Sequence, residues 1–291
     1  MLLRGSIHQM TQSLHNRGSK RDVKIDETFA RLRKERQTGL VTFVTAGDPN
    51  LESTESILLA LDEAGSDILE VGAPFSDPLA DGPVIQRASE RALASNTTLT
   101  STLGMVARVR SRLTAPVVIF SYFNLILALG IEEFAAQASS AGVDGVLALD
   151  LPIEEAGEFR TIMMGAGIDT IFLLSPTTTE KRISKAAELG QGFLYGISRL
   201  GVTGVRNQIA EGAEIMTKRI RALTDMPLAL GFGVSTPEQV AAVGLIADAA
   251  VVGSGLVSVI EETPEEILIE RKVREYIRWL KSGQVANQWV P

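Results

Sequence analysis

The chain of 291 residues contains no cysteine, and its two histidines, His8 and His15, both lie close to the amino terminus. The absence of cysteine excludes a disulfide framework, a zinc–thiolate site and a thiol nucleophile. Without histidine beyond residue 15, the rest of the chain has no imidazole to bind a metal or to act as a general base. We therefore expect no metal site, and we expect carboxylates to carry any acid–base chemistry.

Lysines are also missing from the predicted strands, where a Schiff-base enzyme would need one. None falls on a predicted strand, which argues against a Schiff-base aldolase. There is no P-loop lysine and no complete GxGxxG after the first predicted strand, which argues against nucleotide binding. The net charge of -7 and the pI near 5.1 argue against a nucleic-acid-binding protein. These absences favour an enzyme that acts on a small molecule.

Long uninterrupted apolar segments are absent as well. Residues 113–131 carry no charge and reach the length of a membrane helix, but Pro116, Asn124 and Gly130 interrupt them. We predict a buried strand there, followed by a loop and the start of a helix.

The first two dozen residues differ from the rest of the chain. They carry Arg4, Arg17, Lys20 and Arg21 with no acidic residue before Asp22, and they lack the apolar core of a secretory signal. We predict a flexible extension over residues 1–24 and a cytoplasmic protein. An organellar targeting segment is the alternative.

Short apolar runs alternate with amphipathic stretches from residue 25 onward. The runs predict eight strands, at residues 41–44, 68–71, 117–121, 145–149, 170–174, 193–197, 228–231 and 249–252. Helices are predicted around residues 26–36, 53–64, 85–94, 101–112, 131–141, 154–165, 179–189 and 237–243. This alternation indicates a parallel sheet, and eight units predict a single-domain (β/α)8 TIM barrel over residues 25–291, near the usual size of about 250 residues. The helix at residues 26–36 is expected to cap the bottom of the barrel.

Two carboxylates stand eleven residues apart in LEVGAPFSDPLADGPVIQ, residues 69–86. Glu70 lies near the end of a predicted buried strand, on the same face as Ile68. Asp81 lies in the following loop, which several prolines and glycines stiffen, and such rigid polar loops commonly hold a ligand. The alternative for Glu70 is a strand-end carboxylate tied into a salt bridge or capping the next helix.

Glycine-rich turns follow the last three predicted strands. They are GVTGV at residues 201–205, GFGVS at 231–235 and GSG at 253–255. Glycine lets backbone N–H groups approach an anion closely, and barrels commonly bind phosphate after strands 7 and 8. We therefore predict a phosphate site at these turns, although tight turns between strands and helices use glycine in any case.

Taken together, several motifs resemble the tryptophan synthase alpha subunit. They are LEVGAPFSDPLADGP, TFVTAGDP at residues 42–49, ALDLP at 148–152, YGISRLGVTG at 195–204, GFGVS and VVGSG. The resemblance implies a (β/α)8 barrel that cleaves indole-3-glycerol phosphate to indole and glyceraldehyde 3-phosphate. It implies no cofactor for this half-reaction, with pyridoxal phosphate only in a beta subunit, and it implies an α2β2 heterotetramer.

The resemblance also assigns residues. The catalytic carboxylates fall on Glu70 and Asp81. The positions that bind substrate are Phe43, Tyr122, Tyr195, Thr203, Gly204, Phe232, Gly233, Gly253 and Ser254. The positions that face the partner are Pro74, Phe75, Pro78 and Asp150, and the prolines and Phe75 are expected to be exposed. Thr42 and Ala73 depart from the family, in which proline and a larger aliphatic residue are usual.

A mechanism follows from the bond to be broken. Indole C3 must be protonated, and the glycerol hydroxyl must lose a proton as the carbonyl forms. Glu70 suits both steps because its apolar strand should raise its pKa toward neutrality. Asp81 should stay ionised and stabilise positive charge on the ring. The alternatives are another phosphate-binding barrel enzyme and a non-catalytic homologue that activates a partner.

Overall fold

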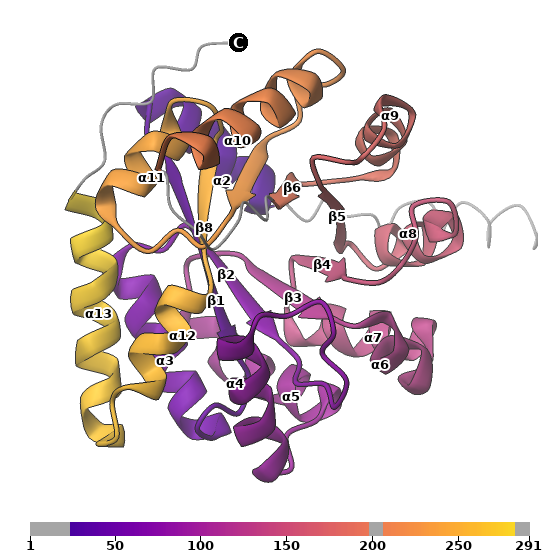
Figure 1. The fold of residues 1–291 in the computed structure, drawn as a ribbon. Helices are drawn as coiled ribbons and strands as arrows, with labels where there is room; N and C mark the ends of the chain where they lie inside the picture. Colours follow the sequence, from indigo (N-terminus) through magenta and orange to yellow (C-terminus); the bar gives the residue numbers. More distant parts are fainter. Residues whose placement is uncertain (1–23, 198–205, 283–291) are drawn as a thin grey trace, which may run out of the picture.

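The computed structural model describes residues 24–197 and 206–282, and these residues form a closed barrel of parallel strands (Figure 1). The strands pair in chain order, and β1 closes the barrel against β8. They are β1 (Gly39–Thr45), β2 (Ile68–Gly72), β3 (Val117–Ser121), β4 (Gly145–Ala148), β5 (Asp169–Leu174), β6 (Leu194–Ile197), β7 (Leu228–Gly231) and β8 (Ala249–Val252). The predicted (β/α)8 barrel is confirmed, with strand ends within two residues of their predicted positions.

Helices surround the strands on the outside (Figure 1). They are α2 (Lys24–Glu35), α3 (Leu51–Ala64), α4 (Pro83–Ala94), α5 (Leu99–Val109) with the 3-10 turn η1 (Arg110–Arg112), α6 (Phe123–Leu129), α7 (Ile131–Ala141), α8 (Ala156–Gly165), α9 (Glu180–Leu189), α10 (Arg206–Arg221), α11 (Pro237–Gly244), α12 (Ser254–Glu261) and α13 (Glu266–Ser282). None of the helices in the described part of the chain is long and apolar enough to cross a membrane.

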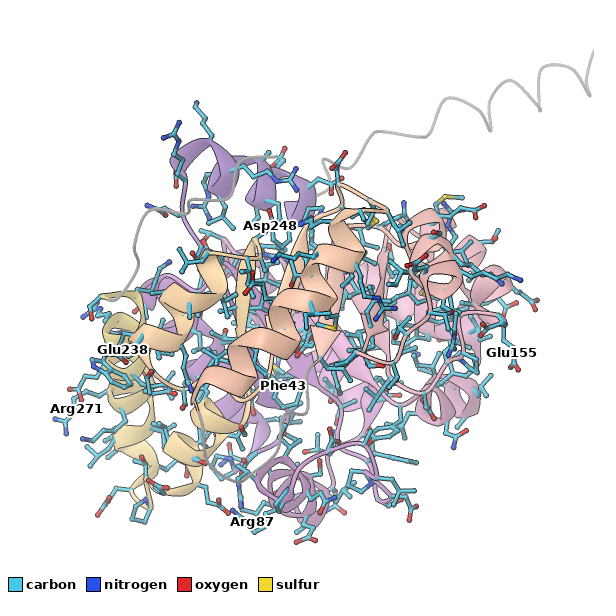
Figure 2. The ribbon with its side chains drawn as sticks, turned by 45° about the horizontal axis from the view of Figure 1, so that its top comes forward. Phe43, Arg87, Glu155, Glu238, Asp248 and Arg271 are labelled. Atoms are coloured by element: carbon cyan, nitrogen blue, oxygen red, sulfur yellow. The ribbon has the colours of Figure 1, made fainter. Side chains whose placement is uncertain are left out.

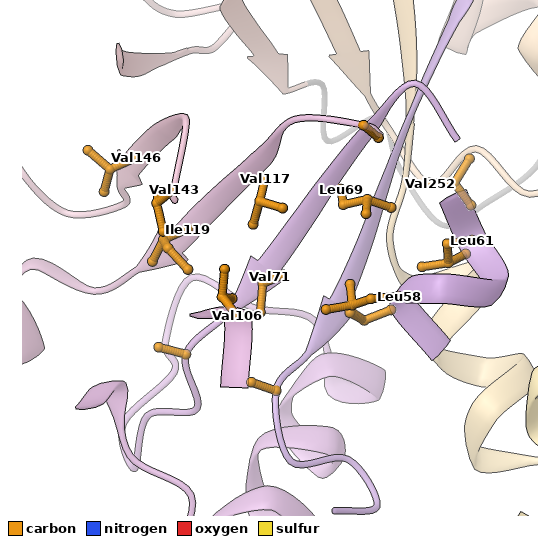
Figure 3. Close-up of a cluster of buried hydrophobic side chains, with 14 of the residues drawn as sticks. Leu58, Leu61, Leu69, Val71, Val106, Val117, Ile119, Val143, Val146 and Val252 are labelled. Atoms are coloured by element: carbon orange, nitrogen blue, oxygen red, sulfur yellow. The ribbon is translucent and has the colours of Figure 1, made fainter. Parts of the chain in front are cut away.

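The strands are apolar on both faces because both faces are covered. On the outer face, Leu69 and Val71 of β2 pack with Leu58 and Leu61 of α3, as Figure 3 shows. Side chains at alternate positions point into the barrel instead, where Ile68, Val118 and Val41 belong to a separate apolar cluster. This two-residue period places Glu70 inside the barrel, on the same face as Ile68.

Helix α2 closes the amino-terminal end of the barrel. Its buried residues Ile25, Phe29 and Leu32 join the interior cluster, and the Phe29 ring lies 5.6 Å from the ring of Phe193. The predicted bottom cap is therefore confirmed. The predicted extension lies outside the described residues apart from Lys24, which is already helical.

Aspartates mark the amino-terminal rim of the barrel, close to α2. Asp67, Asp144 and Asp248 each accept a backbone N–H from an adjacent strand and each pair with a basic side chain. The ion pairs are Arg31–Asp67 (2.6 Å), Lys281–Asp67 (3.4 Å), Arg110–Asp144 (3.0 Å), Arg33–Asp248 (3.3 Å) and Arg221–Asp248. Figure 2 labels Asp248 near α2. These pairs fasten α2, α10 and α13 to the strands.

Candidate active site

Glu70 lies inside the barrel on β2, with Phe43 of β1 and Val118 of β3 as its register partners. Its side chain is fully buried, and within the described residues neither carboxylate oxygen has a hydrogen-bond partner. Burial raises the pKa of Glu70 from 4.5 to about 8. The alternative in which Glu70 is tied into a salt bridge finds no support in the described part of the chain. A buried carboxyl of this kind can exchange a proton near neutral pH.

Asp81 is held in place by its neighbours in the loop after β2. The hydroxyl of Tyr122 donates to Asp81 Oδ2 at 3.1 Å and accepts the backbone N–H of Ala80 at 3.1 Å. The side-chain amide of Gln86 donates to the backbone oxygens of Asp81 (3.0 Å) and Pro78 (3.3 Å). The carboxylate therefore has a fixed position although it stands on a loop, which is the preorganisation that catalysis requires.

Tyr195 points into the barrel from β6 and is 8% exposed. Burial raises its pKa well above the usual value, and the charges of Glu70 and Asp81 add to the shift. The phenol is therefore a neutral hydroxyl that lies near both carboxylates. Its ring lies over Gly231, where a Cβ atom would come within 3.2 Å of the phenol oxygen. The structure thus places Tyr195 near both Glu70 and Asp81, and their catalytic and substrate-binding roles stay predictions.

Aromatic rings form a wall beside these groups. Phe43, near the middle of the molecule in Figure 2, meets Phe120 edge to face, with ring centroids 5.3 Å apart. Gly72 leaves room for this ring, because a Cβ atom there would lie 2.6 Å from Phe43 Cζ. Such a wall suits a flat apolar group.

Two of the predicted phosphate-binding turns lie within the described residues. Gly233 has φ +83, a value that favours glycine, and the space where its Cβ would lie is open. Gly253 is the N-cap of α12 and Ser254 is the first residue of that helix, so free N–H groups stand at this position. Thr203 and Gly204 lie outside the described residues.

The predicted partner face needs one correction. Pro74 is buried, so the expectation that it is exposed is wrong, because the chain is still inside the barrel rim at this point. Phe75 and Pro78 are half-buried, and the Phe75 ring packs on Tyr122 with centroids 4.7 Å apart. Leu79 is a large apolar residue of this loop that is 90% exposed. Asp150 is exposed, and its carboxylate accepts the backbone N–H of Phe123 at 2.5 Å.

Two cavities adjoin this end of the barrel. One of about 390 Å³ opens beside β4, β5 and β6, and its lining includes Ala80, Leu149 and Leu173. A larger cavity of about 680 Å³ lies between α10 and α11, and Phe232 lines it. The smaller cavity touches the Asp81 loop through Ala80, but among the described residues neither lining includes Glu70, Asp81 or Tyr195. The placement of Phe232 in the substrate pocket therefore stays a prediction. Among the described residues, no three acidic or histidine side chains are grouped so as to hold a metal ion.

Comparison with known proteins decides the family. The family model "Tryptophan synthase alpha chain" matches residues 29–284. The chain belongs to this family. The tryptophan synthase alpha chain of Geotalea daltonii is 48% identical over 263 residues, covering 90% of this chain and 99% of that protein. The one from Geobacter sulfurreducens is 51% identical over 238 residues, covering 82% and 90%.

Solved structures agree with the family assignment. Tryptophan synthase subunit alpha from Legionella pneumophila superposes with a TM-score of 0.83 at 36% identity, covering 89% of this chain and 97% of that one. A chain of tryptophan synthase from M. tuberculosis superposes with a TM-score of 0.80 at 30% identity, covering 89% and 98%. The fold and the family therefore rest on both sequence and structure.

Two residues at the site of this tryptophan synthase alpha chain family member are not among those that the sequence predicted. Phe120 lies two residues after Val118 on the inward face of β3, so the two-residue period contained the signal. Gln86 clamps the Asp81 loop through its side-chain amide, and its position after the loop carried no comparable pattern. The hydrogen bond from Tyr122 to Asp81 was likewise not expected, since it depends on how the loop folds back.

Proposed function

We propose that this chain cleaves indole-3-glycerol phosphate to indole and glyceraldehyde 3-phosphate, with Glu70 and Asp81 as its catalytic residues. Membership of the family supports this reaction, because the cleavage is the function of the tryptophan synthase alpha subunit, a lyase of tryptophan biosynthesis. The observation that supports the residue assignment is the fully buried Glu70 carboxyl inside the barrel, with a pKa raised to about 8.

Glu70 supplies the proton. At neutral pH a carboxyl with this pKa is largely protonated, so it can donate to indole C3 and form the indoleninium. The resulting carboxylate then accepts the proton of the glycerol hydroxyl as the carbon–carbon bond breaks and the carbonyl forms. The proton count closes, because Glu70 ends the cycle protonated as it began.

Asp81 stabilises the charge. Protonation at C3 places positive charge on the indole ring, and a carboxylate held beside the ring N–H lowers the energy of that state. The hydrogen bond from Tyr122 and the amide of Gln86 fix its position before substrate arrives. The aromatic pair Phe43 and Phe120 provides an apolar surface for the ring.

The phosphate of the substrate is assigned to the glycine turns. Gly233 and the start of α12 at Gly253 and Ser254 offer backbone N–H groups and a favourable helix dipole. Thr203 and Gly204 complete this part of the proposal from the sequence. Tyr195 lies between the carboxylates and β7 and is assigned to the substrate pocket.

This half-reaction uses only acid–base groups, so we propose that the chain needs no cofactor of its own. Members of this family work with a beta subunit. We propose a cytoplasmic α2β2 heterotetramer in which the beta subunit carries pyridoxal phosphate. The face assigned to the partner includes Phe75, Pro78 and Asp150, to which the exposure of Leu79 adds an apolar contact. Direct transfer would keep indole, which is small and apolar, from being lost to solvent.

The experiment is an indole-release assay on the purified chain with indole-3-glycerol phosphate, alone and with its beta subunit. We expect indole from the chain alone, a higher rate with the partner, and co-migration of the two on a sizing column. No indole under either condition would contradict the reaction. Indole release without co-migration or activation would contradict only the partner assignment.

A further inference from the structure

Tyr276 connects the carboxy-terminal helix to both glycine turns that lie within the described residues. Its hydroxyl, on α13, donates to the backbone oxygen of Ser235 in the turn after β7, at 3.0 Å. The same oxygen atom stands over Gly255 in the first turn of α12, directly after β8, where a Cβ atom would lie only 2.6 Å away. A single hydroxyl therefore lies between two turns that are far apart in the sequence.

Ser235 is also held from its other side. The Gln239 side-chain oxygen accepts the backbone N–H of Ser235 at 2.8 Å and that of Thr236 at 3.2 Å, within a capping box at the start of α11. Gln239 thus fixes the N–H of Ser235, and Tyr276 fixes its carbonyl. The turn that contains Gly233 is anchored through these two contacts just after the glycine itself.

The surroundings of Tyr276 suit a fixed donor. The helix that carries it is anchored by buried Val273 and Ile277 on either side of it in sequence. Burial raises the pKa of Tyr276 to about 12, so its hydroxyl keeps its proton and donates at any physiological pH. The ring of Trp279 packs beside it, with centroids 5.8 Å apart, but is itself about half exposed.

We propose that Tyr276 is a positioning residue that sets the spacing of the turns at residues 231–235 and 253–255, and thereby the affinity for the substrate's phosphate. An anion site built from backbone N–H groups depends on where the backbone is held, because it has no long side chain that can adjust. The inference rests on the phosphate assignment in the proposed function. It adds a residue from α13, the helix of the eighth unit, which packs between α11 and α3.

The test is Tyr276→Phe, which removes only the hydroxyl. Loss of one neutral hydrogen bond should raise KM for indole-3-glycerol phosphate by about three- to tenfold, with kcat changed by less than about twofold. The dissociation constant for inorganic phosphate, measured by calorimetry, should rise by the same factor. A remote phosphate contact contributes about equally to the ground state and the transition state, which is why KM and not kcat should change.

Trp279→Phe is the matched control, since it alters a neighbouring ring on the same helix and leaves the Tyr276 hydroxyl in place. It should leave KM and phosphate affinity unchanged. Unchanged constants in Tyr276→Phe, a loss confined to kcat, or equal losses in the two variants would each overturn the proposal. If the wild-type chain releases no indole, the proposed reaction fails, yet the phosphate constants of the two variants still decide the role of Tyr276.

Gly255→Ala gives a second test that does not depend on removing the hydroxyl. The new methyl group would lie 2.6 Å from the Tyr276 oxygen and 3.1 Å from Ser235 Cβ, so it displaces the hydroxyl and presses on the turn, and we expect a rise in KM at least as large as in Tyr276→Phe. In the double variant the effects should add only in part, because both substitutions disturb the Tyr276 hydrogen bond while Gly255→Ala also presses on Ser235. Fully additive effects would show that the two residues act separately and would contradict the proposal.

Discussion

Two buried carboxyl groups lie at opposite ends of this barrel, and only one of them belongs to the proposed site. Glu70 is buried inside the barrel, toward the carboxyl end of β2, and its pKa is raised to about 8. Asp169 is 4% exposed at the amino-terminal start of β5, and its pKa is raised to about 7. Burial is the main cause in both cases. A raised pKa therefore marks a buried acid and does not by itself mark a catalytic one.

The neighbours distinguish the two groups. Glu70 lies among aromatic rings, with Asp81 and Tyr195 near it and a cavity at its end of the barrel. Asp169 lies beneath α2, where the charges of Asp26 and Asp144 add to its shift. Asp144 has an arginine partner, whereas Asp169 Oδ2 has no hydrogen-bond partner among the described residues. The acid at one end lies beside the proposed catalytic groups, whereas the acid at the other end lies under a packed helix.

The largest effect is expected from Glu70→Gln. The amide keeps the shape but cannot donate and accept the proton, so kcat should fall by about 10² to 10⁴ with the fold intact. Asp169→Asn is the matched control and should leave kcat within about twofold, because it lies at the other end of the barrel. Indole release and circular dichroism measure both. Near-normal turnover in Glu70→Gln, or a similar loss in Asp169→Asn, would contradict the claim that Glu70 is catalytic and Asp169 is not.

A smaller loss is expected from Asp81→Asn. The amide keeps a hydrogen-bond acceptor for Tyr122 but loses the negative charge, so kcat should fall by about 10². KM should change less than kcat, since the charge acts on the transition state. The matched substitution Asp77→Asn, in the same loop on an exposed side chain, should have little effect. Equal losses for the two would assign the effect to the net charge of the loop.

The pH dependence of kcat/KM should show which form of Glu70 is active. The free enzyme must begin with Glu70 protonated, so the rate should fall above a pKa of about 8, by about tenfold per pH unit. Measurement of indole release between pH 6 and pH 10 gives this limb. A profile that rises over the same range would mean that the reaction starts from the carboxylate.

The sequence predicts the strands and helices of this barrel better than the conformation of its loops. The strand positions were readable because strands covered on both faces are apolar throughout, and Glu70 was conspicuous as a charge within such a run. The sequence predicts exposed prolines in the loop after β2, yet Pro74 is buried and Tyr122 reaches across to Asp81. Contacts of this kind join residues about forty positions apart, and no local periodicity encodes them.

The same limit applies to the amino-terminal rim. No motif in the sequence marks the acids before the strands, and only the folded chain shows that Asp67, Asp144 and Asp248 pair with basic side chains. No sequence pattern marks Tyr276 either, because its role depends on how α13 packs over the turns after β7 and β8. The glycines of those turns were visible in the sequence, whereas the residue that holds them was not.

The last prediction concerns stability and not activity. Asp169, at the amino-terminal end of the barrel, should make the free energy of unfolding depend on pH. Its pKa in the folded chain is about 7, against 3.8 for an ordinary aspartate. Between these values the unfolded chain has lost the proton and the folded chain still holds it. The free energy of unfolding therefore falls as pH rises from about 4 to about 7, and the full penalty remains above that range.

Asp169→Asn removes this penalty because an amide does not ionise. We expect the variant to be more stable than the wild type at pH 8.5, by about 1 to 3 kcal/mol, and to differ less at pH 5.5. Urea unfolding at these two values measures the difference. Asp144→Asn serves as the opposite control, since it weakens the ion pair with Arg110 and should destabilise at both. If Asp169→Asn gains no stability at the higher pH, then burial does not raise the pKa of Asp169 in the folded chain and the penalty does not exist.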